Sequence, residues 1–423
     1  DKGLLKVYSA FDTTNFQLTM EDINQPEGVN FKLKNKNFYA NTSYSGDLSS
    51  SLKIFVGGSY TLSKNDVGIE SDDIGNNENS IHLKLKLRKR FSNRIKLSFG
   101  AEQFITDYNE DFANNMFNVS YGYNNNISGV YSEADFIFSR KFALKGGIRG
   151  EYSPMFDEFT VSPRVSVAYK TGRSSQLSLA YGDFYQQPNS DVLKFASDLQ
   201  AQKTQHYILN YQYAANHRIF RAEIYRKQYD KLVTYNSNMP EFDSDYTSDG
   251  DGYAQGIDIF WRDDETIKNV DYWISYSLLD TERKHKNFPK AATPSFANTH
   301  NLSVVAKYWI NDWKSQIGFS YQYGSGRSYT DLNKSGFLQD KTKDYNSVSL
   351  NWAYLISQQK ILYFSINNAF GFQNVNGYQY SDTPDTNGIY NRRSLLPAAD
   401  QFFFVGFFWT ISDDGSDNQL DNL

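Results

Sequence analysis

The sequence has no cysteine among its 423 residues. This absence excludes disulfides, thiolate metal sites and cysteine nucleophiles, and it fits a protein exported by a bacterium. No apolar run approaches the roughly 18 residues that a membrane-spanning helix needs, and the mean hydropathy is -0.62. The net charge of -5 gives no sign of a nucleic-acid partner. No signal peptide is visible before the abrupt start at Asp1, so we expect a mature or trimmed chain.

Aromatic residues are abundant, at 17% of the chain, and the clearest pattern is an alternation over residues 81–88. One face would carry Ile81, Leu83, Leu85 and Leu87, and the other His82, Lys84, Lys86 and Arg88. A strand separates these two sets completely, whereas a helix would mix them. The same pattern recurs along most of the chain. A long sheet that is apolar on one face and charged on the other needs two solvents, lipid and water.

The connections between the predicted strands alternate between short turns and long polar loops. The long ones are 63–79, 107–127, 187–203, 235–252, 280–299, 324–345 and 373–396. Short turns at one end and long loops at the other are typical of an outer-membrane β-barrel, with periplasmic turns and extracellular loops. A soluble propeller or sandwich is the alternative, and strands of about ten residues with one-sided loops disfavour it.

We therefore predict an all-β, transmembrane, antiparallel barrel over residues 1–412 and a polar periplasmic tail over 413–423. The patterns indicate about 19–20 visible strands of an expected 22, with the first two at 4–10 and 16–20. If the last strand runs into the periplasm and successive strands alternate in direction, the strand at residues 4–10 would start outside the cell. Since closed bacterial barrels have an even number of strands, we expect at least one strand upstream of Asp1.

The alternation also predicts which charged side chains face the lumen. Arg or Lys at the midplane of the lipid-facing side would cost about 2–4 kcal/mol each, so the charged set must point inward. The predicted lumen-lining residues are Lys84, Lys86, Arg88, Arg149, Glu151, Arg164, Arg221, Glu223, Lys227, Asp258 and Arg262. In a plugged barrel such a wall would bind the plug, and in an open barrel it would set ion selectivity. A wall that only keeps the interior hydrated or holds a plug is a commoner case than a defined substrate site. No pattern identifies the substrate-binding residues.

One loop carries a candidate metal site. Asp243, Asp245, Asp249 and Asp251 lie close together in a glycine-containing loop, and carboxylate oxygens are ligands for Ca²⁺. The alternative, a solvated acidic loop, is the commoner case, and no other cofactor is indicated. The five histidines are scattered and no serine sits in a Gly-x-Ser-x-Gly turn, so we predict no enzyme activity. An outer-membrane enzyme remains a third class that an activity screen would test.

Five runs carry a family resemblance: SPRVSVAY at 162–169, LAYG at 179–182, YQQP at 185–188, FRAEIYRKQYDKL at 220–232 and GYAQGID at 252–258. With them, most of the chain resembles the C-terminal barrel of a TonB-dependent receptor of the Bacteroidetes type. The resemblance implies import of a scarce solute, such as a siderophore, cobalamin or an oligosaccharide, through a plugged barrel in the outer membrane. It also implies outer-membrane lipids and the TonB complex as partners. A surface lipoprotein or other envelope subunits are further candidate partners.

The sequence departs from the family pattern in one respect. Members of this family carry an N-terminal plug, whereas residues 1–60 already alternate as strands do. We therefore expect a plug and a TonB-binding segment upstream of Asp1. The alternative is a plugless barrel, either a passive porin or a scaffold subunit of an outer-membrane secretion or assembly complex.

Overall fold

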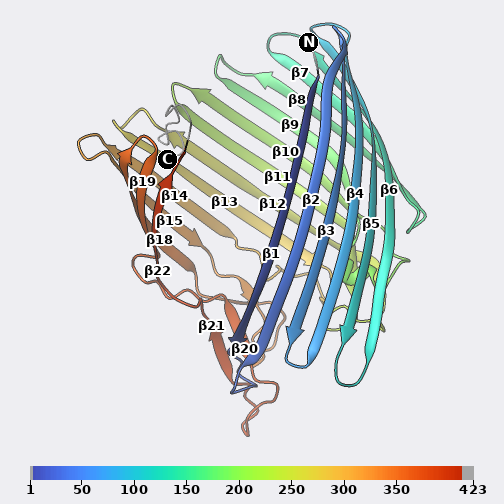
Figure 1. Cartoon of the computed structure of the whole chain (residues 1–423), viewed down its shortest axis with the longest axis vertical. Helices are drawn as coiled ribbons and strands as arrows, with labels where there is room; N and C mark the ends of the chain where they lie inside the picture. Colours follow the sequence, from blue (N-terminus) through green and yellow to red (C-terminus); the bar gives the residue numbers. More distant parts are fainter. Residues whose placement is uncertain (1–2, 412–423) are drawn as a thin grey trace.

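The computed structural model describes residues 3–411, and its main element is one antiparallel sheet of 18 strands. Each strand pairs with the next strand of this sheet in chain order, so the strands lie side by side around a curved wall (Figure 1). The strands of this sheet are β1 (Leu4–Met20), β2 (Val29–Ser49), β3 (Leu52–Ile69), β4 (Asp72–Arg90), β5 (Ile95–Ala113), β6 (Asn118–Ile137), β7 (Phe142–Ser153), β8 (Glu158–Lys170), β9 (Ser175–Gln186), β10 (Gln202–Ala215), β11 (Arg218–Tyr235), β12 (Tyr246–Asp263), β13 (Val270–Lys284), β14 (His300–Ile310), β15 (Ser315–Gly324), β18 (Tyr345–Ser357), β19 (Lys360–Asn367) and β22 (Phe402–Trp409).

The loops add two short hairpins and one helical turn. Strands β16 (Ser328–Tyr329) and β17 (Asp340–Lys341) form one hairpin, and β20 (Gly377–Tyr380) and β21 (Arg392–Leu395) form the other. The helix α1 (Ser190–Leu193) lies between β9 and β10. Among residues 3–411, no helix combines the length and hydrophobicity needed to cross a membrane. The predicted all-β class is confirmed, and the tail predicted over 413–423 lies outside the described residues.

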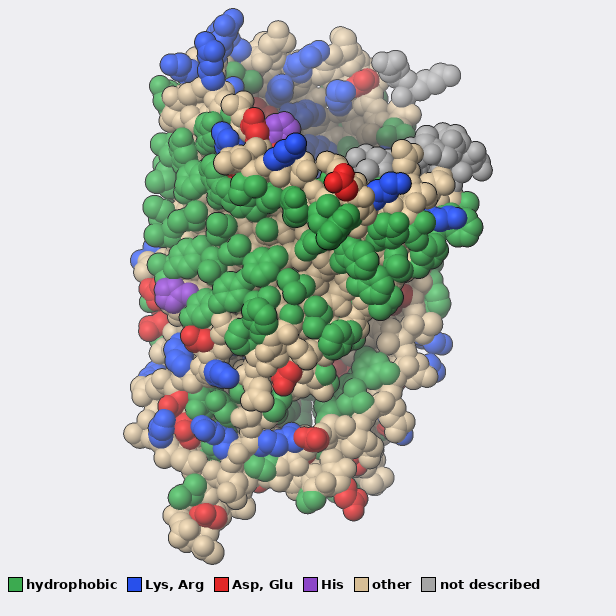
Figure 2. Space-filling view, turned by 90° about the vertical axis from the view of Figure 1, so that its left-hand side faces the viewer, with side chains coloured by type: hydrophobic (Ala, Val, Ile, Leu, Met, Phe, Trp, Pro, Cys, Tyr) green, Lys and Arg blue, Asp and Glu red, His purple; other side chains and the backbone are tan. Residues whose placement is uncertain are grey.

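The alternation in sequence becomes two faces with different chemistry. On β4, Leu83 and Leu85 are 50% and 42% exposed, and apolar residues at matching positions of the other strands are exposed in the same way. Figure 2 shows them as a broad hydrophobic band across the sheet, with charged side chains beyond both of its borders. We call this band the apolar belt, the face that carries it the outer face, and the opposite face the inner face. Exposed apolar side chains in a continuous band are stable only against lipid.

The number of strands differs from the prediction, and so does the position of the first one. Residues 4–10 and 16–20 belong to the single strand β1, whose register with β2 is unbroken from Leu4–Ser45 to Met20–Val29. The even count places the start of β1 and the end of β22 at the same end of the sheet, where the short turns lie (Figure 1). The expectation that residues 4–10 begin at the long-loop end was therefore wrong. Within residues 3–411, β1 and β22 do not pair with each other.

Two of the predicted loops are largely strand. β3 and β4 continue through residues 63–79 to a turn at 70–71, and β5 and β6 continue through most of 107–127. The extensions of β2, β3 and β4 are joined on the inner face by a ladder of amide side chains. Asn35 donates a hydrogen bond to Asn65, whose Nδ2 donates to Oδ1 of Asn76 at 2.8 Å. Side-chain hydrogen bonds hold these strands together beyond the belt, where no lipid covers them.

The two edges of the sheet are connected at the long-loop end. The hairpin β20–β21, in the loop between β19 and β22, contacts the loop between β1 and β2 (Figure 1). Arg393 Nη1 lies 2.9 Å from Glu21 Oε2, and Asn24 Nδ2 donates to Asp382 Oδ1 at 3.1 Å. Polar loop contacts therefore tie β1 to β22 at this end, although the two strands share no backbone hydrogen bonds in the described structure.

We predict that the substitution Asn65→Ala loosens the tip of the β3–β4 hairpin. It removes two side-chain hydrogen bonds, each contributing about 0.5–1.5 kcal/mol, so local opening should become roughly tenfold more frequent. Hydrogen exchange of residues 60–80 measures this change. Lys64→Ala, on the opposite face of the same strand, is the matched control. Equal exchange rates in both variants would show that the ladder does not hold the extension.

Candidate functional site on the inner face

The inner face consists of two parts with different side chains. On strands β4 to β8 charged side chains gather there in a network of ion pairs, and we call this part the charged wall. Strands β13 to β18 present serine, asparagine and glutamine, among them Ser275, Ser303 and Gln322, and we call this part the neutral wall. The strand registers place charged residues opposite charged residues, as at Lys84–Glu102, and uncharged polar residues opposite each other, as at Ser275–Ser303. The chain therefore offers a solute two distinct surfaces.

Glu102 is the centre of the charged wall. Its carboxylate lies 2.5 Å from Lys84 Nζ and 2.5 Å from Arg149 Nη1, and Arg149 Nη2 lies 2.7 Å from Glu151. The Glu102 side chain is 7% exposed, so these ion pairs are largely shielded from water. The sequence indicated the inward direction of Lys84, Arg149 and Glu151 but not the role of Glu102. Its position directly opposite Lys84 on β5 becomes visible only when the register is known.

Two further predicted residues complete this cluster, and a third lies beside it. Lys86 and Arg164 line a cavity of about 300 Å³ together with Lys84 and Arg149. The Arg164 guanidinium also lies over the Phe184 ring, 4.5 Å from its centre. Arg88 pairs with Asp135 at 3.4 Å, nearer the short-turn end. These predicted residues all lie on the face opposite the apolar belt, although most of their charge is engaged within the wall.

The remaining predicted residues lie on β11 and β12, away from that cluster. Asn210 donates to Glu223 at 3.3 Å, and Ser277 donates to Asp258. Arg221 lies over the Phe260 ring, 6.0 Å from its centre, and Lys227 Nζ lies 5.5 Å from the centre of the Tyr225 ring. Each of these charges therefore has its own separate neighbour, and they do not converge on one point.

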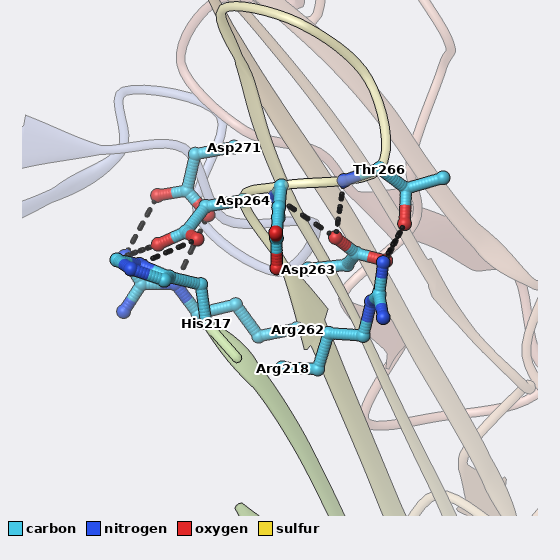
Figure 3. A network of polar contacts seen from close by, with 8 residues as sticks. His217, Arg218, Arg262, Asp263, Asp264, Thr266 and Asp271 are labelled. Atoms are coloured by element: carbon cyan, nitrogen blue, oxygen red, sulfur yellow. Dashed lines mark hydrogen bonds and ion pairs between the residues drawn. The ribbon is translucent and has the colours of Figure 1, made fainter. Parts of the chain in front are cut away.

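Arg262 lies at the short-turn rim, in a network of turn residues (Figure 3). Its guanidinium contacts both carboxylate oxygens of Asp271, at 3.0 and 2.8 Å. Beside it, His217 lies 3.1 Å from Asp264, and Asp263 accepts hydrogen bonds from Arg218 and from the backbone N–H of Thr266. This network joins the β10–β11 and β12–β13 turns, and it gives Arg262 a structural role at the rim.

The loop between β9 and β10, residues 187–201, folds onto the inner face. Lys194 Nζ lies 2.6 Å from Glu110 on β5, and the hydroxyls of Ser190 and Tyr123 lie 2.9 Å apart. Its apolar side chains form a small core with Val233 of β11; the buried members are Val192, Ala196, Leu199 and Val233. The loop is thus a packed element that narrows the interior near the long-loop end.

The four aspartates of the predicted calcium site are not gathered in this structure. Asp249 accepts hydrogen bonds from Thr234 and Thr247, and Asp245 accepts one from Asn236 at 2.8 Å. Among residues 3–411, no three carboxylate, histidine or cysteine side chains are grouped as a metal site requires. Calcium binding by Asp243, Asp245, Asp249 and Asp251 stays a prediction, and it would require this loop to rearrange.

A second loop carries a half-buried histidine. His285 follows β13, and its ring lies 4.5 Å from that of Phe288. Its Nδ1 is buried and has no hydrogen-bond partner among the described residues. Burial, together with the nearby positive charges of Arg283 and Lys286, lowers the pKa of His285 to about 4. The imidazole is therefore neutral at physiological pH.

This pKa predicts that acid loosens the loop at 285–299. The folded loop holds His285 at a pKa below the ordinary value near 6.5, so unfolding of the loop takes up a proton. The contribution of His285 to stability is complete above about pH 6.5 and is lost as the pH falls towards 4. Limited proteolysis at pH 7 and pH 5 measures how readily the loop opens at each pH. His285→Phe should remove the difference, and an unchanged acid effect in that variant would contradict the assignment.

The charged wall gives a prediction about stability. Glu102→Gln leaves Lys84 and Arg149 without their shared carboxylate, and we expect a free energy of unfolding lower by about 2–4 kcal/mol. Glu133→Gln is the matched control, because the pair of Glu133 with Lys145 is more exposed and longer, at 3.3 Å. Urea unfolding in detergent compares the two variants. Equal losses would show that Glu102 does not organise the wall.

The chain was compared with known proteins. The family model described as "TonB dependent receptor-like, beta-barrel" matches residues 3–369. No curated protein sequence matches the chain. Three solved structures illustrate the similarity of fold. The outer membrane transporter YddB from Escherichia coli is 12% identical, with a TM-score of 0.75, and the alignment covers 97% of this chain and 67% of that one.

The ferric yersiniabactin uptake receptor FyuA from Yersinia pestis is 9% identical, with a TM-score of 0.76 and coverage of 97% and 68%. The FrpB iron transporter from Neisseria meningitidis is 12% identical, with a TM-score of 0.69 and coverage of 96% and 69%. The chain thus spans about two thirds of the length of these proteins. With the family model matching most of its length, the chain belongs to the TonB-dependent receptor β-barrel family and is an integral protein of the bacterial outer membrane.

Proposed function

We propose that this chain forms the barrel of an importer that takes up a scarce solute with energy supplied through TonB. The observation that carries the proposal is the inner face, which is polar on both walls while the outer face carries the apolar belt. Family membership supports it independently. Siderophores, cobalamin and oligosaccharides are the solute classes we consider, and the Bacteroidetes type of the receptor stays a prediction.

The charged wall is suited to hold a plug domain. Its ion pairs fix Lys84, Arg149 and Glu151 in place around Glu102, so a partner domain would meet a preorganised polar surface. Residues 3–411 form the sheet, its hairpins and its loops, and they contain no separate domain that fills the interior. TonB-driven import therefore requires a plug in addition to the residues described.

The mass of the protein in its native outer membrane tests this requirement. The 423 residues of the sequence account for 48.7 kDa. A denatured mass larger by a domain is expected if the barrel works with a plug of the same chain. A mass close to 48.7 kDa would favour the alternative of a passive porin or a scaffold subunit.

Uptake by whole cells tests the energy requirement. Accumulation of labelled ferric siderophore, cobalamin and oligosaccharide is compared in cells with and without this protein, with and without TonB, and with a protonophore. We expect at least one solute to accumulate only when the protein, TonB and the proton gradient are all present. Accumulation that continues without TonB, together with steady conductance of the purified protein in planar bilayers, would overturn the proposal in favour of a porin.

A further inference from the structure

The neutral wall contains a cavity that the sequence did not indicate. Its volume is about 340 Å³, within the range of small-molecule sites. Residues of β13, β14, β15 and β18 form its floor, and parts of the loops 285–299, 325–344 and 368–401 border it at the long-loop end. A solute entering from outside the cell would therefore meet this cavity in the outer half of the barrel.

Hydroxyl and amide groups dominate the lining. They belong to Ser275, Ser277, Asn298, Asn301, Ser303, Gln322, Ser325, Thr342 and Asn376. Several of these groups are engaged within the protein; Asn298, for example, donates to the backbone carbonyl of Ser325. By contrast, the side chains of Asn301, Ser303 and Gln322 make no hydrogen bond to other described residues. Amides and hydroxyls both donate and accept hydrogen bonds, and this combination matches the hydroxyl groups of a sugar.

Two cations stand at the mouth of the cavity without an acidic partner. Arg327 Nε has one long hydrogen bond, of 3.4 Å, to Asn298, and Lys343 Nζ donates to the backbone carbonyl of Gln373 at 3.1 Å. The nearest carboxylate in sequence, that of Asp344, is engaged by Gly326 N–H at 2.8 Å and Tyr323 O–H at 2.9 Å. No Asp or Glu is among the described residues that line the cavity. An anionic group on the solute would supply the missing negative charge.

An aromatic ring completes the set. Tyr345 begins β18 opposite Gly324 of β15, lines the cavity and is 40% exposed. An exposed tyrosine ring offers an apolar face to the C–H face of a sugar while its hydroxyl stays in water. Hydrogen-bonding groups, two cations and one aromatic ring therefore lie around a single space.

The two walls differ in the charges that an anionic solute would meet. On the charged wall, the positive charges of Lys84 and Arg149 are balanced by Glu102 and Glu151 at 2.5 to 2.7 Å. Lys86 and Arg164 line the same cavity without an ion pair among the described residues, but the carboxylates of Glu102 and Glu133 line it too and would repel an anionic solute. At the neutral wall the same solute pairs with Arg327 and Lys343 without breaking an ion pair. The neutral wall is therefore the better site, although it carries fewer charges.

We infer that this cavity is a binding site for an acidic sugar, in which Arg327 and Lys343 hold the anionic group and Asn301, Ser303 and Gln322 hold the hydroxyls. The inference rests on the proposed function, since it names the class of solute that the importer takes. The anionic group is a carboxylate, as in a uronic acid, or a phosphate. Both are bound by the same cations, and the experiment separates them.

Calorimetry on the full protein, purified in detergent from its native membrane, tests the site. The probes are trigalacturonate, maltose 1-phosphate and the neutral sugar maltotriose. We expect one of the two acidic probes to bind at least tenfold more tightly than maltotriose, and that probe identifies the anionic group. The double variant R327Q/K343Q should lose at least tenfold in affinity for it, while R221Q, on β11, should bind it as the unaltered protein does.

A second variant covers the case in which R327Q/K343Q does not fold. Q322E adds a negative charge to the lining and should weaken the acidic probe more than maltotriose. Wild-type affinity for the acidic probe in R327Q/K343Q or in Q322E would overturn the inference, as would no binding of either acidic probe. Uptake separates the two proposals. TonB-dependent uptake that R327Q/K343Q leaves intact would refute this site alone, and binding that needs Arg327 without any TonB-dependent uptake would refute the importer alone.

Discussion

The backbone hydrogen bond is the interaction on which the rest of this structure depends. Lipid offers no partner for N–H and C=O groups, so a chain without spanning helices crosses a membrane only by pairing every strand with its neighbours. Serial pairing from β1 to β22 meets that demand, except at the two edges. It also forces successive side chains onto opposite faces, so the outer face must be apolar where it meets lipid. The inner face is free of that requirement, and its chemistry carries the function.

Within the belt, the sequence alone was sufficient to predict the strands and their faces, because lipid on one side and water on the other impose a strict alternation. Beyond the belt that signal disappears. The extensions of β3 and β4 are rich in Asn, Asp, Ser and Gly, which is also the composition of loops. In the structure the backbone pairing continues through them without a break, and Asn35, Asn65 and Asn76 add side-chain hydrogen bonds across the neighbouring strands. The polar middle of β1 has the same composition, so the sequence predicts two strands where the structure has one.

The functional site was predictable only in part. The alternation of side chains along each strand predicts that Lys84, Arg149 and Glu151 point inward. It does not predict that Glu102 joins the two cations, because that contact depends on the register between β4 and β5. The inward fold of the loop at 187–201 depends on partners as distant as Glu110 and Tyr123. The cavity of the neutral wall is built from four strands and three loops, none of which has an unusual composition by itself. Contacts between segments far apart in the sequence leave no local pattern to read.

The contrast between the walls follows from the energetics of charge in a confined space. A shielded ion pair repays the cost of removing water only when its partners stay close and well oriented, so the residues around Glu102 form a fixed surface with little capacity left for a ligand. Uncharged amides and hydroxyls cost less to desolvate and exchange partners readily. A surface of that kind, with two unneutralised cations at its rim, binds a polar solute and also releases it. Release matters as much as capture in a transporter, because a site that held its solute as firmly as Glu102 holds Arg149 would block the path.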